Sequence, residues 1–190
     1  LGATFYTSGA PFLGQGPGNA GMVRIESYED AEKFVQRKAQ AGSIVVKDYL
    51  QPTRNQRRWL AQAARTYGLG ITGHERNDVA TQMSMVVDGY NALEHTLFGT
   101  GGRLYGDIRK FLTASGISIT PTVSEGSGSR YMYARYPPNS RYENCLTENV
   151  EARKLKSEKG VLSGDVPFVD SLVYDMAKQY AEMLNDGAHV

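Results

Sequence analysis

The stretch ITGHERNDVATQMSMVVDGYNALEHT, residues 71–96, decides the fold class of this chain. A short apolar run ends at His74, an amphipathic helical pattern follows over residues 79–87, and a second short strand pattern ends at His95. A strand, a helix and a strand at this interval predict a β/α unit with parallel strands. The two imidazoles should then project at one rim of the sheet, where α/β barrels keep their active sites.

The same alternation continues on both sides of this unit. We expect strands near residues 3–8, 43–49, 69–74, 92–95 and 117–123, and helices near 27–42, 52–68, 79–89, 105–116 and 165–187. The glycine-rich stretch 9–22 and the Gly, Ser, Pro and Tyr-rich stretch 124–144 read as loops, the second long enough to act as a lid. Ser27, followed three residues later by Asp30, predicts a capping box. The pattern as a whole predicts an α/β fold, a partial (β/α)8 TIM barrel that forms a single domain over residues 1–190.

Composition excludes several classes of partner. The chain has 190 residues, 41% of them hydrophobic and 22% charged, which is typical of a globular protein. A formal net charge of +1 favours neither nucleic acid nor an anionic membrane as partner. No stretch supplies the ~18 apolar residues of a membrane span. The single cysteine, Cys145, has no partner for an internal disulfide, and the abrupt first residues suggest a piece of a longer chain.

Three side chains capable of binding a metal or moving a proton follow three consecutive predicted strands: Lys47, His74 and His95. Neutral imidazoles are ligands of zinc, which polarises a carbonyl group and lowers the pKa of a bound water. A neutral lysine amine at the same rim could take up carbon dioxide and become a carbamate, an oxygen ligand able to bridge two ions. The alternative is structural: the histidines are packed residues, and Lys47 pairs with an acidic neighbour, which could be Asp48, Glu75 or Glu94.

Two further side chains are candidates for substrate binding. Tyr49 should share the inward face of Lys47, because strand side chains alternate. Arg54, just after that strand, could reach the rim and bind a substrate carboxylate. The arginines around Trp59 are expected on a solvated helix face, and His189 is expected to be structural.

The segments KDYLQPTRNQRRWLAQAARTYGLGITGHE (47–75) and MSMVVDGYNALEHT (83–96), with a strand ending in TPTV (120–123), resemble the amidohydrolase superfamily. The likeness is to the imidazolonepropionase-like branch and to its relatives fused to a tricorn-type β-propeller. The resemblance implies a (β/α)8 barrel with one or two divalent ions, most often zinc, at the carboxyl ends of the strands. Lys47 matches the fourth-strand lysine, which is often carboxylated, and His74 and His95 match the histidines of the fifth and sixth strands.

The resemblance covers about strands three to seven of such a barrel. The family's H-x-H pair on the first strand and its aspartate on the eighth do not occur in this chain, so the first strands and the last one would be missing. The fragment by itself is therefore expected to be inactive. Some propeller-linked relatives carry an acidic residue where His74 stands, which makes His95 the firmer of the two matches.

The resulting expectation is a metal-dependent hydrolase that cleaves C–N bonds in amide, peptide-like or cyclic amide substrates. His95 would stabilise the developing oxyanion or hold the metal. Two alternatives remain open: a non-catalytic barrel that serves as a binding or scaffold module, and a barrel enzyme that uses Lys47 as a Schiff-base amine. Expected partners are a small-molecule or peptide-like substrate, a fused β-propeller and further copies of the chain. The resemblance allows an exported or periplasmic location, and a cytoplasmic one is equally open.

Overall fold

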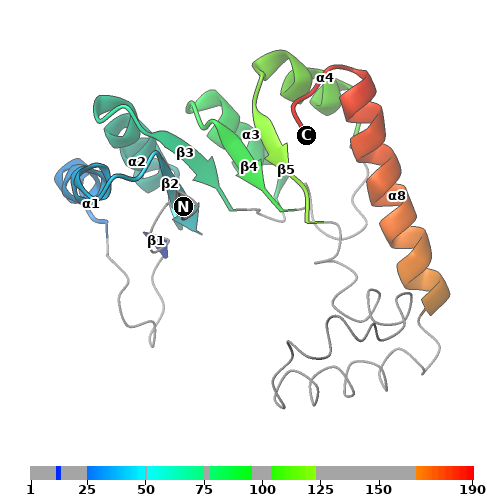
Figure 1. Ribbon diagram of the computed structural model, residues 1–190, viewed down its shortest axis with the longest axis horizontal. Coiled ribbons are helices and arrows are strands. Elements are labelled where there is room, and N and C mark those ends of the chain that lie inside the picture. Colours follow the sequence, from blue (N-terminus) through cyan, green and yellow to red (C-terminus); the bar gives the residue numbers. More distant parts are fainter. Residues whose placement is uncertain (1–11, 14–24, 50, 75–77, 96–103, 123–165) are drawn as a thin grey trace, which may run out of the picture.

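The computed structural model describes residues 12–13, 25–49, 51–74, 78–95, 104–122 and 166–190. Strands and helices alternate along the chain (Figure 1). The elements are β1 (Phe12–Leu13), α1 (Tyr28–Gln40), β2 (Val45–Tyr49), α2 (Arg54–Thr66), β3 (Gly70–Gly73), α3 (Val79–Val87), β4 (Ala92–Glu94), α4 (Gly106–Ser115), β5 (Ser118–Thr120) and α8 (Val166–Asn185). None of the helices within these ranges has the length and apolar character needed to cross a bilayer.

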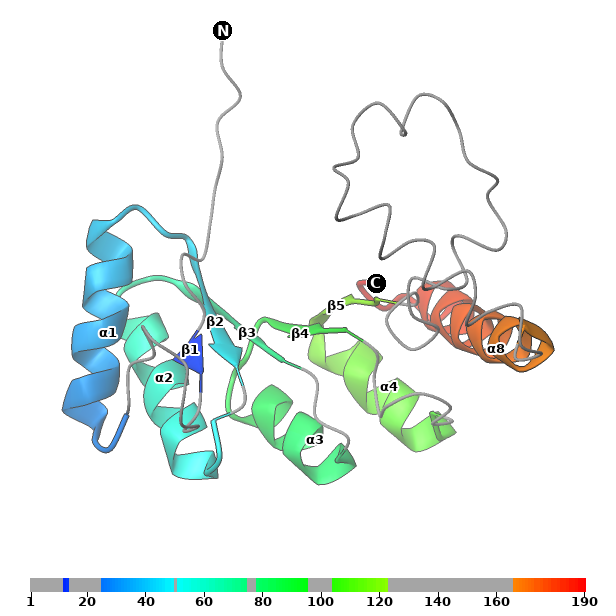
Figure 2. The same cartoon turned by 90° about the horizontal axis from the view of Figure 1, so that it is seen from below.

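The strands form one sheet in sequence order, β1-β2-β3-β4-β5, and every neighbouring pair is parallel. Helices α1 to α4 lie on the same side of this sheet (Figure 2). Sequential parallel strands with helices on one face are wound as in a β/α barrel, whereas a doubly wound sheet carries helices on both faces. The predicted α/β class and partial barrel architecture are confirmed.

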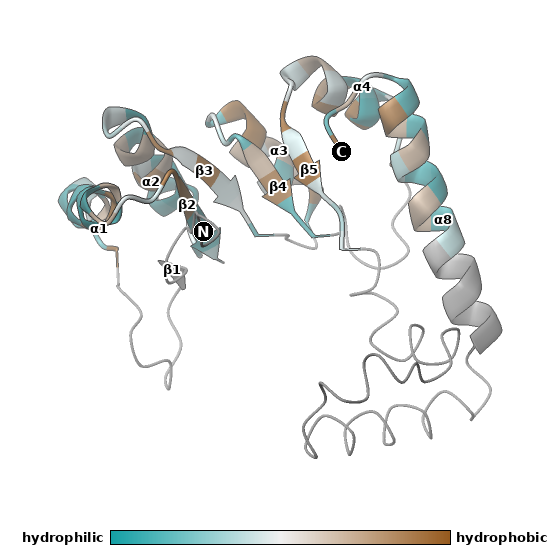
Figure 3. Ribbon diagram, viewed as in Figure 1, coloured by the Kyte–Doolittle hydropathy of each residue, from teal (hydrophilic) through white to brown (hydrophobic). Residues whose placement is uncertain are grey.

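The hydrophobic core fills the space between the sheet and its helices. One residue from each of β2, β3, β4 and β5 points to this side and is at most 3% exposed: Val46, Ile71, Leu93 and Ile119. The helices contribute Leu60, Met85 and Leu112, which are also buried. Hydropathy colouring shows apolar patches along the strands and on the helices (Figure 3). Since burying one such side chain contributes about 1.5–3 kcal/mol, this layer holds the strands in place.

The helices begin and end at residues that local chemistry favours. The predicted capping box is present, since Asp30 N donates to Ser27 Oγ and Ser27 N donates to Asp30 Oδ2. Thr53 caps α2 in the same way, and the Asp78 carboxylate accepts from two amides at the start of α3. At its end, α4 stops at Gly116, whose φ of 67° is left-handed.

One expected loop is wrong. Phe12 and Leu13 form the edge strand β1 and pair with Asp48 and Tyr49 of β2, although the glycine-rich sequence around them shows no strand periodicity. Pairing with β2 supplies backbone hydrogen bonds that no local pattern can reveal. The expected strand at 3–8 and the long loop at 124–144 lie outside the described residues. The strand expected over 117–123 is shorter, because it ends before Pro121, which has no amide to donate.

The end of the chain returns to the sheet. Helix α8 is joined to α4 by Arg109, which forms ion pairs with Glu182 at 2.6 Å and with Asp186 at 2.7 Å. The residues after α8 then run beside β5, where Ile119 N donates to His189 O at 2.7 Å and His189 pairs with Ser118 in parallel. The backbone of His189 therefore lies next to β5, on the side away from β4, while its imidazole is exposed.

Gly73 allows Met85 and Tyr90 to pack closely against β3. A Cβ atom at this position would lie 2.7 Å from Met85 Sδ and 3.2 Å from the Tyr90 ring, and both residues are buried. We expect Gly73→Ala to lower the free energy of unfolding by about 1–3 kcal/mol, because neither buried neighbour can move away without disturbing the core. Urea denaturation measures the effect.

The matched control is Gly106→Ala, at a helical position where an added Cβ meets nothing within 4 Å. Its stability should equal or slightly exceed that of the wild type. If Gly73→Ala is as stable as Gly106→Ala, the side chains around Gly73 can move aside at little cost, and the prediction is wrong.

Candidate functional site

The carboxyl ends of β2, β3 and β4 carry a row of polar side chains on the face of the sheet opposite the helices. The register places Lys47 opposite Thr72, and Thr72 opposite Ala92, two residues before Glu94. Because side chains alternate along a strand, Lys47, Thr72 and Glu94 share this inner face, while Val46, Ile71 and Leu93 face the helices.

Lys47, Glu94 and Thr72 form one network. Lys47 Nζ lies 3.4 Å from Glu94 Oε2, and these side chains are 14% and 29% exposed. The other carboxylate oxygen, Glu94 Oε1, accepts a hydrogen bond from Thr72 Oγ1 at 2.6 Å. Glu94 is therefore held from two strands and in turn holds the ammonium group of Lys47. This is the ion pair that the sequence offered as the structural alternative for Lys47.

The aromatic candidates lie beside this network. The rings of His74 and His95 meet edge to face with centroids 4.5 Å apart, and the Tyr49 ring lies 4.2 Å from that of His74. The backbone fixes His74, whose amide donates to Asp48 O at 2.9 Å. His95 has a φ of 70°, and its Nδ1 lies 2.9 Å from Thr122 Oγ1 on the segment after β5. Four of the five predicted site residues thus gather at one rim.

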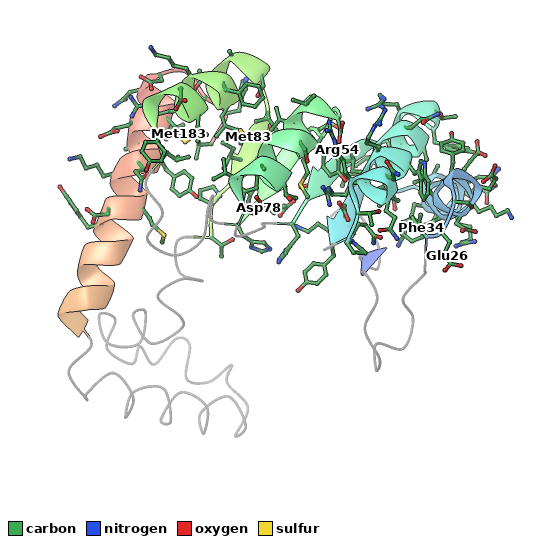
Figure 4. The ribbon with its side chains drawn as sticks, turned by 180° about the vertical axis from the view of Figure 1, so that it is seen from behind. Glu26, Phe34, Arg54, Asp78, Met83 and Met183 are labelled. Carbon is green, nitrogen blue, oxygen red and sulfur yellow. The ribbon has the colours of Figure 1, made fainter. Side chains whose placement is uncertain are left out.

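Arg54 is the fifth predicted site residue, and it does not join this group. Its guanidinium donates to both carboxylate oxygens of Asp88, from Nε and Nη2 at 2.9 Å each, and so links α2 to the end of α3. Figure 4 labels Arg54 on the helical layer of the fold. This pairing raises the pKa of Arg54 above its usual value. Its role in substrate binding stays a prediction.

A buried polar pair supports the rim from the helix side. Asp48 is fully buried, and its Oδ2 accepts a hydrogen bond from the Tyr90 hydroxyl at 2.7 Å. The Tyr90 ring packs against Gly73, so its side chain runs along β3 to reach Asp48. Burial, followed by the negative charge of Asp48, raises the pKa of Tyr90 well above its ordinary value of 10. Neutral Tyr90 therefore remains a hydrogen-bond donor at all physiological pH values.

The donor set at the rim consists of two imidazoles and the amine of Lys47. Among the described residues, no three His, Cys, Asp or Glu side chains are grouped so that they could hold a metal ion. His74 and His95 could supply two nitrogen ligands to one ion, because their rings are in contact. Lys47 binds Glu94 as an ammonium group and would need to become a carbamate to join them.

Three residues of this site were not identified from the sequence: Thr72, Tyr90 and Thr122. Alternation from His74 back to Thr72 could have placed that hydroxyl on the inner face, because the two residues are two apart. Thr122 could have been found in the same way, since it lies two residues after Thr120, the last residue of β5. Tyr90 carried no such signal, because it lies in the turn between α3 and β4.

The fold has known counterparts. The structure of a bottromycin amidohydrolase superposes with a TM-score of 0.69 at 15% sequence identity and covers 96% of this chain and 44% of its own. The crystal structure of an uncharacterized protein superposes with a TM-score of 0.51 at 14% identity, covering 88% of this chain and 38% of its own. No protein-family model and no curated protein sequence matches the chain.

These similarities show that the chain shares the fold of part of the bottromycin amidohydrolase structure. The chain spans less than half the length of either matching structure. At this level of identity the shared feature is the path of the backbone, so the chemistry of the rim must be argued from its own side chains.

The pair formed by Tyr90 and Asp48 makes a prediction about stability. Tyr90→Phe should lower the free energy of unfolding by about 2 kcal/mol at pH 7, because it removes a donor from a buried carboxylate. A tyrosine whose pKa is raised in the fold stabilises the protein below pH 10, and this contribution is lost as pH rises further, because only the unfolded chain releases the proton. The stability difference between the wild type and Tyr90→Phe should therefore shrink between pH 9 and pH 11 in urea titrations.

Tyr105→Phe provides the control, since Tyr105 is 71% exposed and should change stability little at any of these pH values. A difference between the wild type and Tyr90→Phe that stays constant up to pH 11 would contradict the raised pKa.

Proposed function

We propose that this chain carries part of the active site of a metal-dependent hydrolase that cleaves C–N bonds in amide, peptide-like or cyclic amide substrates. The observation that carries the proposal is the gathering of Lys47, His74 and His95 at the carboxyl ends of three adjacent parallel strands. Active sites of β/α barrels are built at this end. The structural likeness to a bottromycin amidohydrolase supports the same class of reaction.

The two imidazoles fit a zinc site. His74 and His95 would hold the ion through ring nitrogens, since their rings are in contact with centroids 4.5 Å apart. A divalent ion held there would polarise the substrate carbonyl and lower the pKa of a bound water. The resemblance implies that its remaining ligands are an H-x-H pair and a carboxylated Lys47, so that one or two ions are bound.

Each side chain at the rim then has a proposed role. His74 would hold the ion, and His95 would either hold the ion as well or stabilise the oxyanion that develops on the carbonyl. Tyr49, whose ring lies against His74, lines the substrate side of the rim and limits the access of water to it. Glu94, fixed by Thr72, keeps Lys47 in place before it becomes a ligand.

Lys47 also distinguishes this proposal from a Schiff-base mechanism. In both mechanisms the ammonium group of Lys47 first loses a proton and so leaves its ion pair with Glu94. The neutral amine then bonds to carbon dioxide and releases a proton in one case, or bonds to a substrate carbonyl and releases water in the other. Borohydride with a carbonyl substrate reduces a Schiff base to a stable secondary amine and leaves a carbamate untrapped. A covalent adduct on Lys47 would therefore favour the Schiff-base enzyme.

The metal site makes a direct prediction for protein expressed from the full reading frame. Wild-type protein should hold zinc or another divalent ion at stoichiometric level, and His74→Ala, His95→Ala and Lys47→Ala should each lower that content. Hydrolysis of amide or cyclic amide substrates should fall by roughly 10²–10³-fold in His95→Ala, because either a metal ligand or an oxyanion-stabilising group is lost. Elemental analysis and product release measure the two effects.

The chain has only three histidines, which makes His189→Ala a matched control. His189 joins β5 through its backbone and has an exposed side chain, so its removal should leave metal content and hydrolysis unchanged. Unchanged metal content in both His95→Ala and Lys47→Ala would refute the proposal.

A further inference from the structure

His95 occupies a position that strand geometry alone would turn away from the site. Side chains alternate along β4, so Leu93 faces the helices, and His95, two residues later, would be expected to face them as well. Its φ of 70° instead places it in the left-handed region, and its ring meets His74 at the rim. This conformation is uncommon for residues other than glycine, although histidine adopts it more often than most, and surrounding contacts stabilise it.

Two contacts from the β5 segment fix His95. Its amide donates to Thr120 O at 2.9 Å, which keeps the backbone paired although the strand pattern has ended. Its ring nitrogen Nδ1 lies 2.9 Å from Thr122 Oγ1 in a partly buried contact. The first contact fixes the position of the Cα atom, and the second fixes the rotation of the ring.

We propose that Thr122 is a positioning residue for His95: its hydroxyl oxygen accepts a hydrogen bond from Nδ1–H, so that Nε2 is the nitrogen that binds the metal. A neutral imidazole carries one proton, and a metal binds the nitrogen without it. An oxygen acceptor on the proton-bearing nitrogen therefore selects the tautomer and the ring orientation at once. This inference rests on the proposed function, since it assigns the ligand atom of His95.

A threonine suits this role because of its branched side chain. Branching at Cβ restricts χ1, which limits the directions that the hydroxyl can take. Valine has the same shape without the hydroxyl, and serine keeps the hydroxyl without the methyl group. Thr122→Val and Thr122→Ser therefore separate the hydrogen bond from the packing of the side chain.

The first measurement uses metal-free protein. Long-range ¹H–¹⁵N NMR correlations of the His95 ring report which nitrogen carries the proton. We expect the Nδ1–H tautomer in the wild type and in Thr122→Ser, and a shift toward the Nε2–H tautomer in Thr122→Val. Thr120→Val, the same substitution on an exposed side chain two residues earlier, should leave the tautomer unchanged.

The second measurement is the affinity of protein expressed from the full reading frame for zinc ion alone, by competition with a chelator of known strength. Thr122→Val should weaken zinc binding by roughly 10–100-fold, as expected when the partner of a metal-bound histidine is removed. Thr122→Ser and Thr120→Val should stay close to the wild type. Thermal unfolding of each variant shows whether it remains folded, and the recovery of affinity in Thr122→Ser carries the argument if the valine variant is unstable.

The two measurements separate this inference from the proposed function. If Thr122→Val keeps both the Nδ1–H tautomer and full zinc affinity, Thr122 does not position His95. If the wild type binds no zinc but the tautomer changes in Thr122→Val, the positioning role stands and the proposed hydrolase is refuted.

Discussion

The parallel register of β2, β3 and β4 is the constraint on which the site depends. It aligns Lys47 with Thr72 and Thr72 with Ala92, and alternation then places Glu94 on the same face one step nearer the rim. A shift of one residue in any of these strands would move its polar side chain into the apolar layer beneath the helices. Burial of Ile71 and Leu93 on one face of the sheet therefore determines that Thr72 and Glu94 point to the other face. The same alternation of side chains thus forms both the core and the candidate site.

The underside of the rim shows how this register is secured. Tyr90 passes beneath β3 to reach Asp48, and the absence of a side chain at Gly73 leaves room for its ring. The contact joins the turn before β4 to the end of β2, so it spans three strands and resists their sliding. A buried carboxylate is costly unless it is hydrogen-bonded, which makes any displaced register less favourable than the native one.

The elements of this fold could be predicted from sequence because their signals are local. Ser27 with Asp30 marked a helix start, Gly116 marked a helix end, and the apolar runs before Lys47 and His74 marked buried strands. Residues whose positions depend on distant partners were beyond such patterns. The edge strand at Phe12 exists through pairing with β2, and the guanidinium of Arg54 is directed by Asp88, 34 residues away. The row of candidates at the rim followed from strand ends alone, whereas Thr122 became visible only when β5 was placed beside β4.

The left-handed backbone at His95 also restricts which sequences can occupy this position. Glycine adopts that conformation freely, and asparagine and aspartate adopt it more readily than most residues do. Histidine shares this tendency with asparagine and aspartate, but it adopts the conformation less freely than glycine does. A descendant of this chain that no longer used the ring would be free to acquire glycine at position 95, which would relieve the backbone strain. The residue at this position in related chains should therefore indicate whether they still use the imidazole ring.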